Sequence, residues 1–366
     1  MKKGLSTLLG LALVLAIAGC NPNRGDGGGQ DAAGDTDVTL MLPFQKGLSF
    51  WSEMAPEELG YYKAEGLKVT IQPSGGGTEA LQQLLTGNVD MAMVAPAVIL
   101  EAVAQGKQVA VPYTDKHSGL FSIVVPESSD IRSPADLRGK TVGITDFGGG
   151  EMPIVRAILG KAGLKEGSDT KLVAVGEGNP SVAKAIRDGR VQAYGASWSD
   201  FIPIMGLGMK LREVTFPEIQ KLPSEVLAVR PEYFKDNRET VEKVARSMAK
   251  ASYFVTQFPD KWLGMLKKLA PQDVADPALA QLGMRIWLQI AAYPKNGQGD
   301  YVFGQNEPAA WEQLEQIARD YSGGAGKPRA DVDVRGIVDD SLIQKVNDFP
   351  RDEIKQQGEA LDLSFP

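Results

Sequence analysis

The stretch KVTIQPSGGGTEALQQLLTGNVDMAMV, residues 68–94, decides the fold class. Its two short apolar runs, Lys68–Gln72 and Met91–Val94, have the length and composition of strands. Between them, Glu79–Thr86 carries its apolar residues at the spacing of one helix face. A strand, a helix and a second strand in this order are typical of a parallel sheet with helices on its faces. The stretch therefore predicts an α/β fold.

The same alternation continues along the chain and forms two sets of elements. Further strands are expected at Val38–Leu42, Val109–Tyr113, Leu120–Val125, Thr141–Ile144, Leu172–Val175 and Ala193–Ala196, and helices at Glu53–Glu65, Ala97–Gln105, Pro153–Ala162 and Ser181–Asp188. The run Val226–Val229 predicts a strand that returns to the first set, and long helices follow at Arg238–Gln257, Ala278–Tyr293 and Pro308–Tyr321. We therefore expect two lobes, each a mostly parallel sheet with flanking helices: residues 38–115 with 225–322, and residues 116–224. Residues 323–366 are expected to form a tail packed on this body.

The composition restricts the chemistry that the chain can perform. With 366 residues, the chain is too long for one comfortable hydrophobic core. Its formal net charge of −7 becomes −9 without Lys2 and Lys3, and an acidic surface argues against nucleic acid as a partner. A single cysteine, Cys20, and a single histidine, His117, exclude disulfide frameworks, Cys-rich zinc sites and Cys/His dyads. We expect no catalytic residue, metal or cofactor, and we place His117 in a hinge or at a rim.

The first residues have the pattern of a lipoprotein export signal. Lys2 and Lys3 precede the apolar run Leu8–Ile17, and small residues lead into Cys20. Residues 1–19 are expected to be removed, and an acyl group on Cys20 would hold the protein at a membrane surface. The alternative is an ordinary cleavage site with a chance cysteine. Residues 20–37 are rich in glycine and predict a flexible tether.

Three separate motifs carry a resemblance to a known family. They are Glu58–Tyr62 with Glu65–Leu67, then Leu84–Ala92, then Asp136–Gly143. In these motifs the chain resembles the sulfonate, nitrate and taurine binding proteins, and also the binding proteins for thiamine-pyrimidine precursors. The resemblance runs from about Val38 to Phe349.

The resemblance implies a two-lobed periplasmic-binding-protein type II fold and a role as the solute-binding protein of an ABC importer. The expected partners are a small organic solute and the transmembrane subunits of a permease, and the protein itself is expected to be a monomer. Two alternatives stay open: a pyrimidine-precursor synthase on the same fold, and an extracellular solute sensor. The export signal argues against the synthase, whose cofactor and substrate would be cytosolic.

Two glycine-rich loops at the ends of predicted strands are candidates for ligand binding. Each offers free backbone amides, which could hold an oxyanion of the ligand. The alternative is that the glycines only make turns. The residues predicted to bind ligand are Ser74, Gly76, Gly77 and Thr78 in the first loop, and Asp146, Phe147, Gly148, Gly149 and Glu151 in the second. Glu151 has the further alternative of stabilising the N-terminus of its own helix.

Aromatic and small residues at other strand ends complete the predicted site. Phe44 and Trp51 could stack on a planar ligand and Lys46 could balance a negative charge, although Trp51 could equally belong to the core. Ala95 and Pro96 offer backbone contacts, and Tyr194, Ser197 and Trp198 end a strand of the second lobe. No arginine occurs in any of these loops. The absence of arginine weakens a simple sulfonate or nitrate assignment. We expect a solute with one acidic end and a hydrogen-bond-donating or aromatic end, drawn from sulfonates, other organic acids and pyrimidine-like heterocycles.

Overall fold

The computed structural model describes residues 35–322 and 330–366. Cys20, the predicted export signal and the first part of the predicted tether lie outside the described residues. The first strand begins at Thr36, so the last two residues of the segment predicted as tether belong to a strand instead. No helix in the described ranges is both long enough and apolar enough to cross a membrane.

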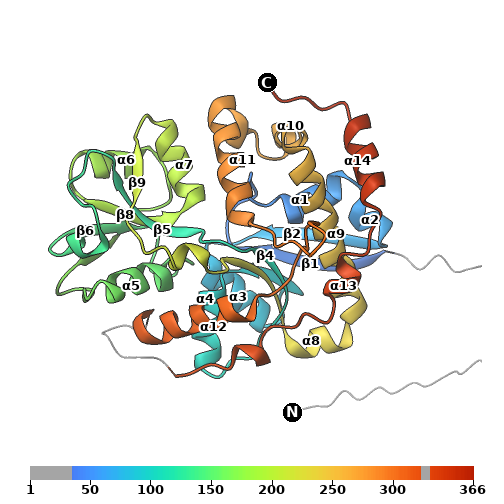
Figure 1. Cartoon of the computed structure of the whole chain (residues 1–366), viewed down its shortest axis with the longest axis horizontal. Helices are drawn as coiled ribbons and strands as arrows, with labels where there is room; N and C mark the ends of the chain where they lie inside the picture. Colours follow the sequence, from blue (N-terminus) through green and yellow to red (C-terminus); the bar gives the residue numbers. More distant parts are fainter. Residues whose placement is uncertain (1–34, 323–329) are drawn as a thin grey trace, which may run out of the picture. The chain divides into compact units, whose positions relative to one another are not determined.

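The first sheet has five strands in the order β2-β1-β3-β10-β4 (Figure 1). β1 (Thr36–Leu42) lies parallel to β2 (Leu67–Pro73) and to β3 (Met91–Val94). β10 (Glu225–Val229) lies antiparallel between β3 and β4 (Ala110–Lys116). Every residue of β3 and β10 is buried, which explains why their sequences are apolar runs without alternation. The chain therefore leaves this sheet after β4 and returns to its centre at β10.

The second sheet also has five strands, in the order β7-β6-β8-β5-β9. Its strands are β5 (Phe121–Pro126), β6 (Thr141–Ile144), β7 (Lys171–Ala174), β8 (Ala193–Ser197) and β9 (Leu211–Glu213). β6 is parallel to β7 and β8, whereas β5 is antiparallel to β8 and β9. Each sheet is thus mostly parallel at one side and carries antiparallel strands at the other.

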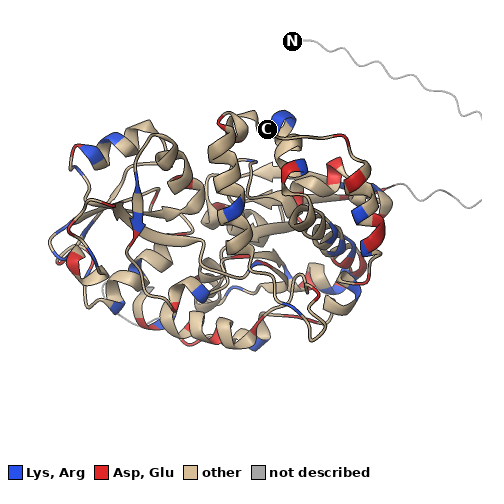
Figure 2. Cartoon of the chain, turned by 45° about the horizontal axis from the view of Figure 1, so that its top comes forward, with Lys and Arg blue, Asp and Glu red and all other residues tan. Residues whose placement is uncertain are grey.

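Helices follow the strands and pack on the sheets. In the segments of the first sheet they are α1 (Trp51–Glu58), α2 (Tyr61–Ala64), α3 (Gly77–Leu85), α4 (Pro96–Ala104), α8 (Pro231–Asp236), α9 (Arg238–Gln257), α10 (Pro259–Leu269), α11 (Pro277–Ala291), α12 (Pro308–Ile317), α13 (Ile343–Val346) and α14 (Arg351–Ala360). In the segments of the second sheet they are α5 (Met152–Lys161), α6 (Pro180–Arg187) and α7 (Trp198–Gly206). The ribbon of the outer helices carries interspersed basic (blue) and acidic (red) residues in the view of Figure 2.

Several predicted elements differ from those observed. The helix predicted at Glu53–Glu65 is wrong in its middle, because Gly60 adopts a left-handed φ of 77° and separates α1 from α2. The helix predicted at Pro308–Tyr321 ends at Ile317, and a π-helical turn, Ala318–Ser322, follows it. Trp198 does not end a strand but begins α7. The helices α7, α8, α10 and α14 have no counterpart in the sequence prediction.

Two connections join the sheets, the short segment 117–120 and the longer segment 214–224, which contains a 3-10 turn at Ile219–Lys221. They are tied to each other, since Gly119 N and Ser118 Oγ both donate to the Gln220 carbonyl, at 2.8 and 2.6 Å, and Ser224 Oγ donates to Ser118 O. The backbone amides of His117 and Ser118 donate to the carbonyls of Ala291 and Ile290 at the end of α11. The two connections therefore form one hydrogen-bonded strip that α11 supports.

Candidate functional site

A cavity of about 440 Å³ lies between elements of the two sheets. From the first sheet's segments its wall comprises the β1–α1 loop, residues 44–50, together with residues 272–273 and α11. From the second sheet's segments it comprises the β7–α6 connection and α7. The volume is that of a pocket for a small organic molecule. The lining residues are Phe44, Gln45, Lys46, Gly47, Leu48, Ser49, Phe50, Glu177, Gly178, Ser197, Ser199, Asp200, Ile202, Pro203, Gln272, Asp273, Leu279, Ala280, Gly283 and Trp287.

The β1–α1 loop is held against the first wall by Asp273. The Asp273 carboxylate accepts a hydrogen bond from Leu48 N at 2.7 Å, and Trp262 Nε1 donates to Leu48 O at 2.9 Å. A side chain at Gly47 would overlap this carboxylate, so the loop needs a glycine there. Burial raises the pKa of Asp273, and its hydrogen bond from Leu48 N offsets only part of the shift.

The opposite wall is held together by Asp200 in the first turn of α7. Its carboxylate accepts from Ser197 Oγ at 2.7 Å and Ser197 N at 3.2 Å, which forms a capping box. Its other oxygen accepts from Gly178 N at 2.8 Å and so ties the β7–α6 connection to α7. Asp200 is buried, and burial raises its pKa. One carboxylate therefore positions both elements that the second sheet's segments contribute to the cavity.

The two glycine-rich loops lie against each other. A Cβ placed on Gly76 would be 3.5 Å from the Gly148 carbonyl oxygen, and one on Gly77 would be 3.8 Å from Gly150 Cα. The two loops therefore face each other, and several of their amides donate to acceptors within the chain. Gly75 N donates to Glu79 Oε2 at 2.8 Å, Gly148 N to Asp146 Oδ1 at 2.7 Å and Gly149 N to Asp146 O at 3.1 Å. Ser74 and Thr78 are half-buried in the first loop.

Glu151, at the end of the second loop, hydrogen-bonds to the residue at its beginning. It is buried, and its carboxylate accepts from Thr145 N at 3.1 Å and from the Thr145 hydroxyl. Burial raises its pKa, while the bond from Thr145 acts in the opposite direction. A side chain at Gly149 would overlap the Glu151 carboxylate. The Glu151 carboxylate is therefore bonded to the Thr145 end of the loop and makes no capping hydrogen bond with its own helix, α5.

Among the predicted aromatic contacts, Phe44 lines the cavity but Trp51 does not. The prediction for Trp51 is wrong because its ring is fully buried in the core, where Nε1 donates to Tyr293 Oη at 3.2 Å. Tyr194 is also fully buried, and its hydroxyl donates to Gly176 O at 2.8 Å. Trp198 is half-buried with its ring edge-on to Phe201, and Phe147 is exposed. Of the residues predicted around the rim, Phe44, Lys46 and Ser197 line the cavity.

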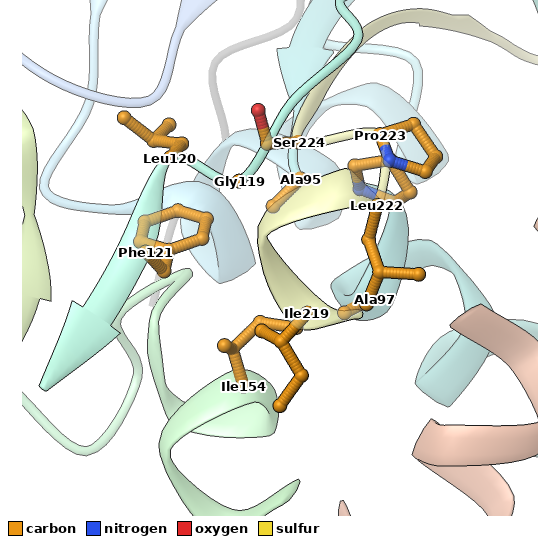
Figure 3. Close-up of a pocket in the computed structure, with 11 residues that line it drawn as sticks. Ala95, Ala97, Gly119, Leu120, Phe121, Ile154, Ile219, Leu222, Pro223 and Ser224 are labelled. Carbon is orange, nitrogen blue, oxygen red and sulfur yellow. The ribbon is translucent and has the colours of Figure 1, made fainter. Parts of the chain in front are cut away.

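Ala95 and Pro96 lie in a different place, a small void beside the connections. Figure 3 shows its walls, with Phe121 and Ile154 on one side and Leu222 and Pro223 on the other. Its volume of about 10 Å³ holds no more than one water molecule. A further depression, of about 530 Å³, lies near Arg230 and is lined by segments of the first sheet alone. The cavity beside α7 and α11 is therefore the candidate for a ligand shared by both sheets.

Comparison with known proteins identifies the family of this chain. Residues 51–262 match the family described as NMT1/THI5 like. The chain belongs to this family. Its relatives include a binding protein of Brucella abortus, 27% identical over 60% of this chain and 67% of the relative, and the riboflavin-binding protein RibY of Chloroflexus aurantiacus, 23% identical over 84% of this chain and 86% of the relative.

Solved structures of binding proteins share the fold of this NMT1/THI5-like protein. The aliphatic sulphonate-binding protein SsuA of Escherichia coli superposes with a TM-score of 0.62 at 17% identity, covering 82% of this chain and 91% of its own. The nitrate-binding protein NrtA of Synechocystis has a TM-score of 0.59 at 14% identity, covering 87% and 91%. The α/β two-lobed periplasmic-binding-protein fold predicted from the sequence is confirmed. The relatives named here are binding proteins.

Several cavity residues of this NMT1/THI5-like protein escaped the sequence prediction. The set comprises Glu177, Gly178, Ser199, Asp200, Ile202, Pro203, Gln272, Asp273, Leu279, Ala280, Gly283 and Trp287. Those on α7 had a usable signal, because Ser197 is followed three residues later by Asp200, the spacing of a capping box. Those on α11 had none, since their apolar spacing is that of any helix packed on a core.

A buried cluster of charges lies where the connections leave the first sheet. The carboxylates of Glu53, Asp115 and Glu225 approach within 4.8 Å of one another, the only such acidic group in the described residues. The Lys116 ammonium pairs with Asp115 and lies 3.7 Å from Glu225 Oε2. Burial by itself lowers the pKa of Lys116, but Asp115 and its other neighbours hold that pKa above its ordinary value. The cation of this cluster is therefore the lysine of the chain itself.

Burial also shifts the pKa values of the other titratable groups in and beside the cluster. Burial raises the pKa of Glu53 well above its ordinary value, with Asp115 adding to the effect. Burial also raises the pKa of Glu225 to about 7, with Lys116 opposing it. His117, next in the chain, shifts in the opposite sense: burial lowers its pKa to about 4, so it is neutral at pH 7. None of these three groups lines the cavity.

Replacing Glu225 by glutamine is expected to stabilise the protein more at high pH than at low pH. The pKa of Glu225 is about 7 in the folded chain and about 4.5 unfolded, so the wild type loses stability as the pH rises through this window. Glutamine resembles the protonated acid at every pH. The advantage of Glu225→Gln should grow by up to about 1.4 kcal/mol per pH unit between these values.

Urea unfolding of both proteins at pH 5, 6, 7 and 8 measures this difference. Glu127→Gln, at an exposed position outside the cluster, is the control and should show a constant difference from the wild type. A difference for Glu225→Gln that does not change with pH would contradict the expectation.

Proposed function

We propose that this protein is the solute-binding component of an ABC importer. It is exported, held at the membrane by lipid on Cys20, and acts as a monomer that captures a small organic solute between its lobes. It then presents the closed form to the transmembrane subunits of a permease. The observation that carries the proposal is the cavity of about 440 Å³ whose walls come from both sheets.

The connections between the sheets support a closing motion. Within the described residues two segments, 117–120 and 214–224, join the sheets, and they are hydrogen-bonded into one strip. A ligand that contacts both walls favours the form in which the walls are close, because its contacts differ between the open and closed forms. The α11 helix lines the cavity through Gly283 and Trp287 and supports the strip through Ile290 and Ala291. One rigid element therefore links the ligand to the hinge.

The relatives support the transport role. The riboflavin-binding and sulphonate-binding proteins described above are named for small organic solutes. The family match, residues 51–262, covers both connections between the sheets and α7. An enzyme would need a nucleophile, an acid or a cofactor site facing the cavity. Of the three acidic residues that line it, Asp200 and Asp273 are engaged with backbone amides of the wall, and Glu177 is exposed.

A melting-temperature screen tests the proposal. The chain without residues 1–20 is mixed with a library of small organic solutes, and a ligand that prefers the folded form raises the melting temperature. The matched pair Gly283→Leu and Gly283→Ala then locates the site. A Cβ at residue 283 is 3.5 Å from Ile202 Cδ1 and 3.7 Å from Leu48 Cδ1, so alanine fits, whereas leucine extends into the cavity.

Leucine at residue 283 is expected to weaken binding of any hit at least tenfold, and alanine is expected to leave binding within about threefold. Circular dichroism checks that both variants fold. The proposal fails if no solute in the library stabilises the wild-type chain. Equal affinity in all three proteins would place the ligand outside this cavity.

Cys20→Ser is expected to release the protein from the membrane. Serine cannot receive the thioether-linked lipid, and nothing else in the described ranges is a membrane-spanning helix. Expression in a bacterial host with labelled palmitate, followed by ultracentrifugation, should show labelled wild type in the pellet and unlabelled variant in the supernatant. An unlabelled wild type would contradict the proposed anchor and leave the binding proposal in place.

A further inference from the structure

The positions in the second sheet's segments where an anion would bind are occupied by carboxylates of the chain. Free amides at a helix start form the usual protein site for a sulfonate, phosphate or carboxylate. In the loop between β6 and α5, Glu151 accepts from Thr145 N and from the Thr145 hydroxyl. In the same loop, Asp146 Oδ1 accepts a hydrogen bond from Gly148 N. These donors therefore already hydrogen-bond to carboxylates of the chain when no ligand is bound.

The same arrangement occurs at the cavity wall. Asp200 accepts from Ser197 N, Ser197 Oγ and Gly178 N, and all three residues line the cavity. At α6, the Asn179 side chain accepts from Ser181 N and Val182 N. An anionic ligand would have to displace a buried carboxylate that makes three hydrogen bonds. Such a displacement is costly, because it leaves Asp200 buried without its partners.

The charges that line the cavity have the opposite sign from an anion site. Glu177, Asp200 and Asp273 are acidic, Lys46 is the one basic residue among the lining residues described, and none of these is an arginine. Glu177 and Lys46 are exposed, so Lys46 can turn to solvent while Asp200 and Asp273 stay in the walls. Burial raises the pKa of both aspartates, and a nearby cation would favour their charged forms.

The rest of the lining is apolar. Phe44 and Phe50 come from the β1–α1 loop, Ile202 and Pro203 from α7, and Trp287 from α11. Aromatic faces and aliphatic side chains suit the apolar body of a ligand, and an aromatic face also attracts a cation. The cavity thus combines an acidic side with an apolar side.

We infer that the solute is an organic amine or ammonium compound with an apolar ring or chain. Its cationic group lies toward Glu177 and Asp200, and its apolar body lies against Phe44 and Trp287. This inference rests on the proposed function. It separates the protein from the sulphonate- and nitrate-binding proteins that share its fold, whose ligands, by their names, are anions.

Three probes with one naphthyl ring and different end groups test the inference. They are 2-naphthylethylammonium, 2-naphthylethanol and 2-naphthylethanesulfonate, measured by calorimetry and melting temperature on the chain without residues 1–20. The ammonium compound is expected to bind at least tenfold more tightly than the sulfonate, with the alcohol between them. Tightest binding by the sulfonate, or binding by none of the three, overturns the inference.

Variants of Glu177 add a test of position. Glu177→Gln should weaken binding of the ammonium probe about fivefold and leave the affinity for the alcohol unchanged. Glu177→Lys should reduce or reverse the ratio by which the protein binds the ammonium probe more tightly than the sulfonate. Glu127→Gln, at an exposed glutamate outside the cavity, is the control. An unchanged preference in Glu177→Lys overturns the inference. The proposed function fails separately, only if no solute of any charge stabilises the protein in the broad screen.

Discussion

Replacing Lys116 by methionine is expected to lower the free energy of unfolding by about 3–5 kcal/mol. The Lys116 side chain is fully buried, pairs with Asp115, and lies 3.7 Å from Glu225 and 4.2 Å from the centre of the Trp51 ring. Methionine would fill much of the same volume but would leave three buried carboxylates without a cation. Urea unfolding at pH 8 is the measurement, because the raised pKa of Glu225 keeps that group charged only at high pH.

Two further variants separate the buried charge from the general effect of losing a lysine. Lys184→Met removes an exposed partner of Asp188 and should change the stability by less than about 0.5 kcal/mol. The double variant Lys116→Met with Asp115→Asn should recover part of the loss, since it removes one of the carboxylates left unpaired. A Lys116→Met protein as stable as Lys184→Met would show that the cluster needs no cation.

This cluster also marks the limit of what the sequence predicts. The strands β3 and β6 have the predicted bounds, as does α9, because each is a run of apolar or amphipathic residues whose period is local. The pairing of Glu53 with Asp115 and Glu225 joins residues far apart in the chain. No local pattern distinguishes these three from exposed acids, and only the return of β10 beside β4 brings them together.

In the candidate site, too, local sequence patterns predict some residues and miss those whose role depends on the folded structure. The strand-end rule found the β1–α1 loop and the start of α7, because ligands collect beyond the carboxyl ends of parallel strands. It also selected Trp51 and Tyr194, whose rings are buried, because composition alone does not tell a core aromatic from one at a rim. The amides of the glycine-rich loops were predicted to be free. Their partners, Glu79, Asp146 and Glu151, are close in sequence, but choosing among such acids requires the geometry of the folded loop.

Two glycines that line the same cavity should respond in opposite ways to an added methyl group. In Gly178→Ala the Cβ would overlap the backbone oxygen of Asp200, which cannot move without pulling α7 away from the β7–α6 connection. We expect a loss of about 1–3 kcal/mol in the free energy of unfolding and, because the Gly178–Asp200 hydrogen bond stretches, a loss of ligand binding of at least tenfold.

Gly283→Ala is the matched variant on the other wall. Its Cβ meets Ile202 and Leu48 at ordinary contact distances, and residue 283 lies within α11, where alanine is favoured over glycine by about 0.5–1 kcal/mol. Unfolding curves should therefore show this variant equal to or more stable than the wild type, with binding retained. Equal losses in both would mean that the wall tolerates no change at all, and tolerance in both would mean that the Gly178–Asp200 contact does not hold α7. Only opposite responses are consistent with a second wall that Asp200 fastens and a first wall that α11 keeps rigid.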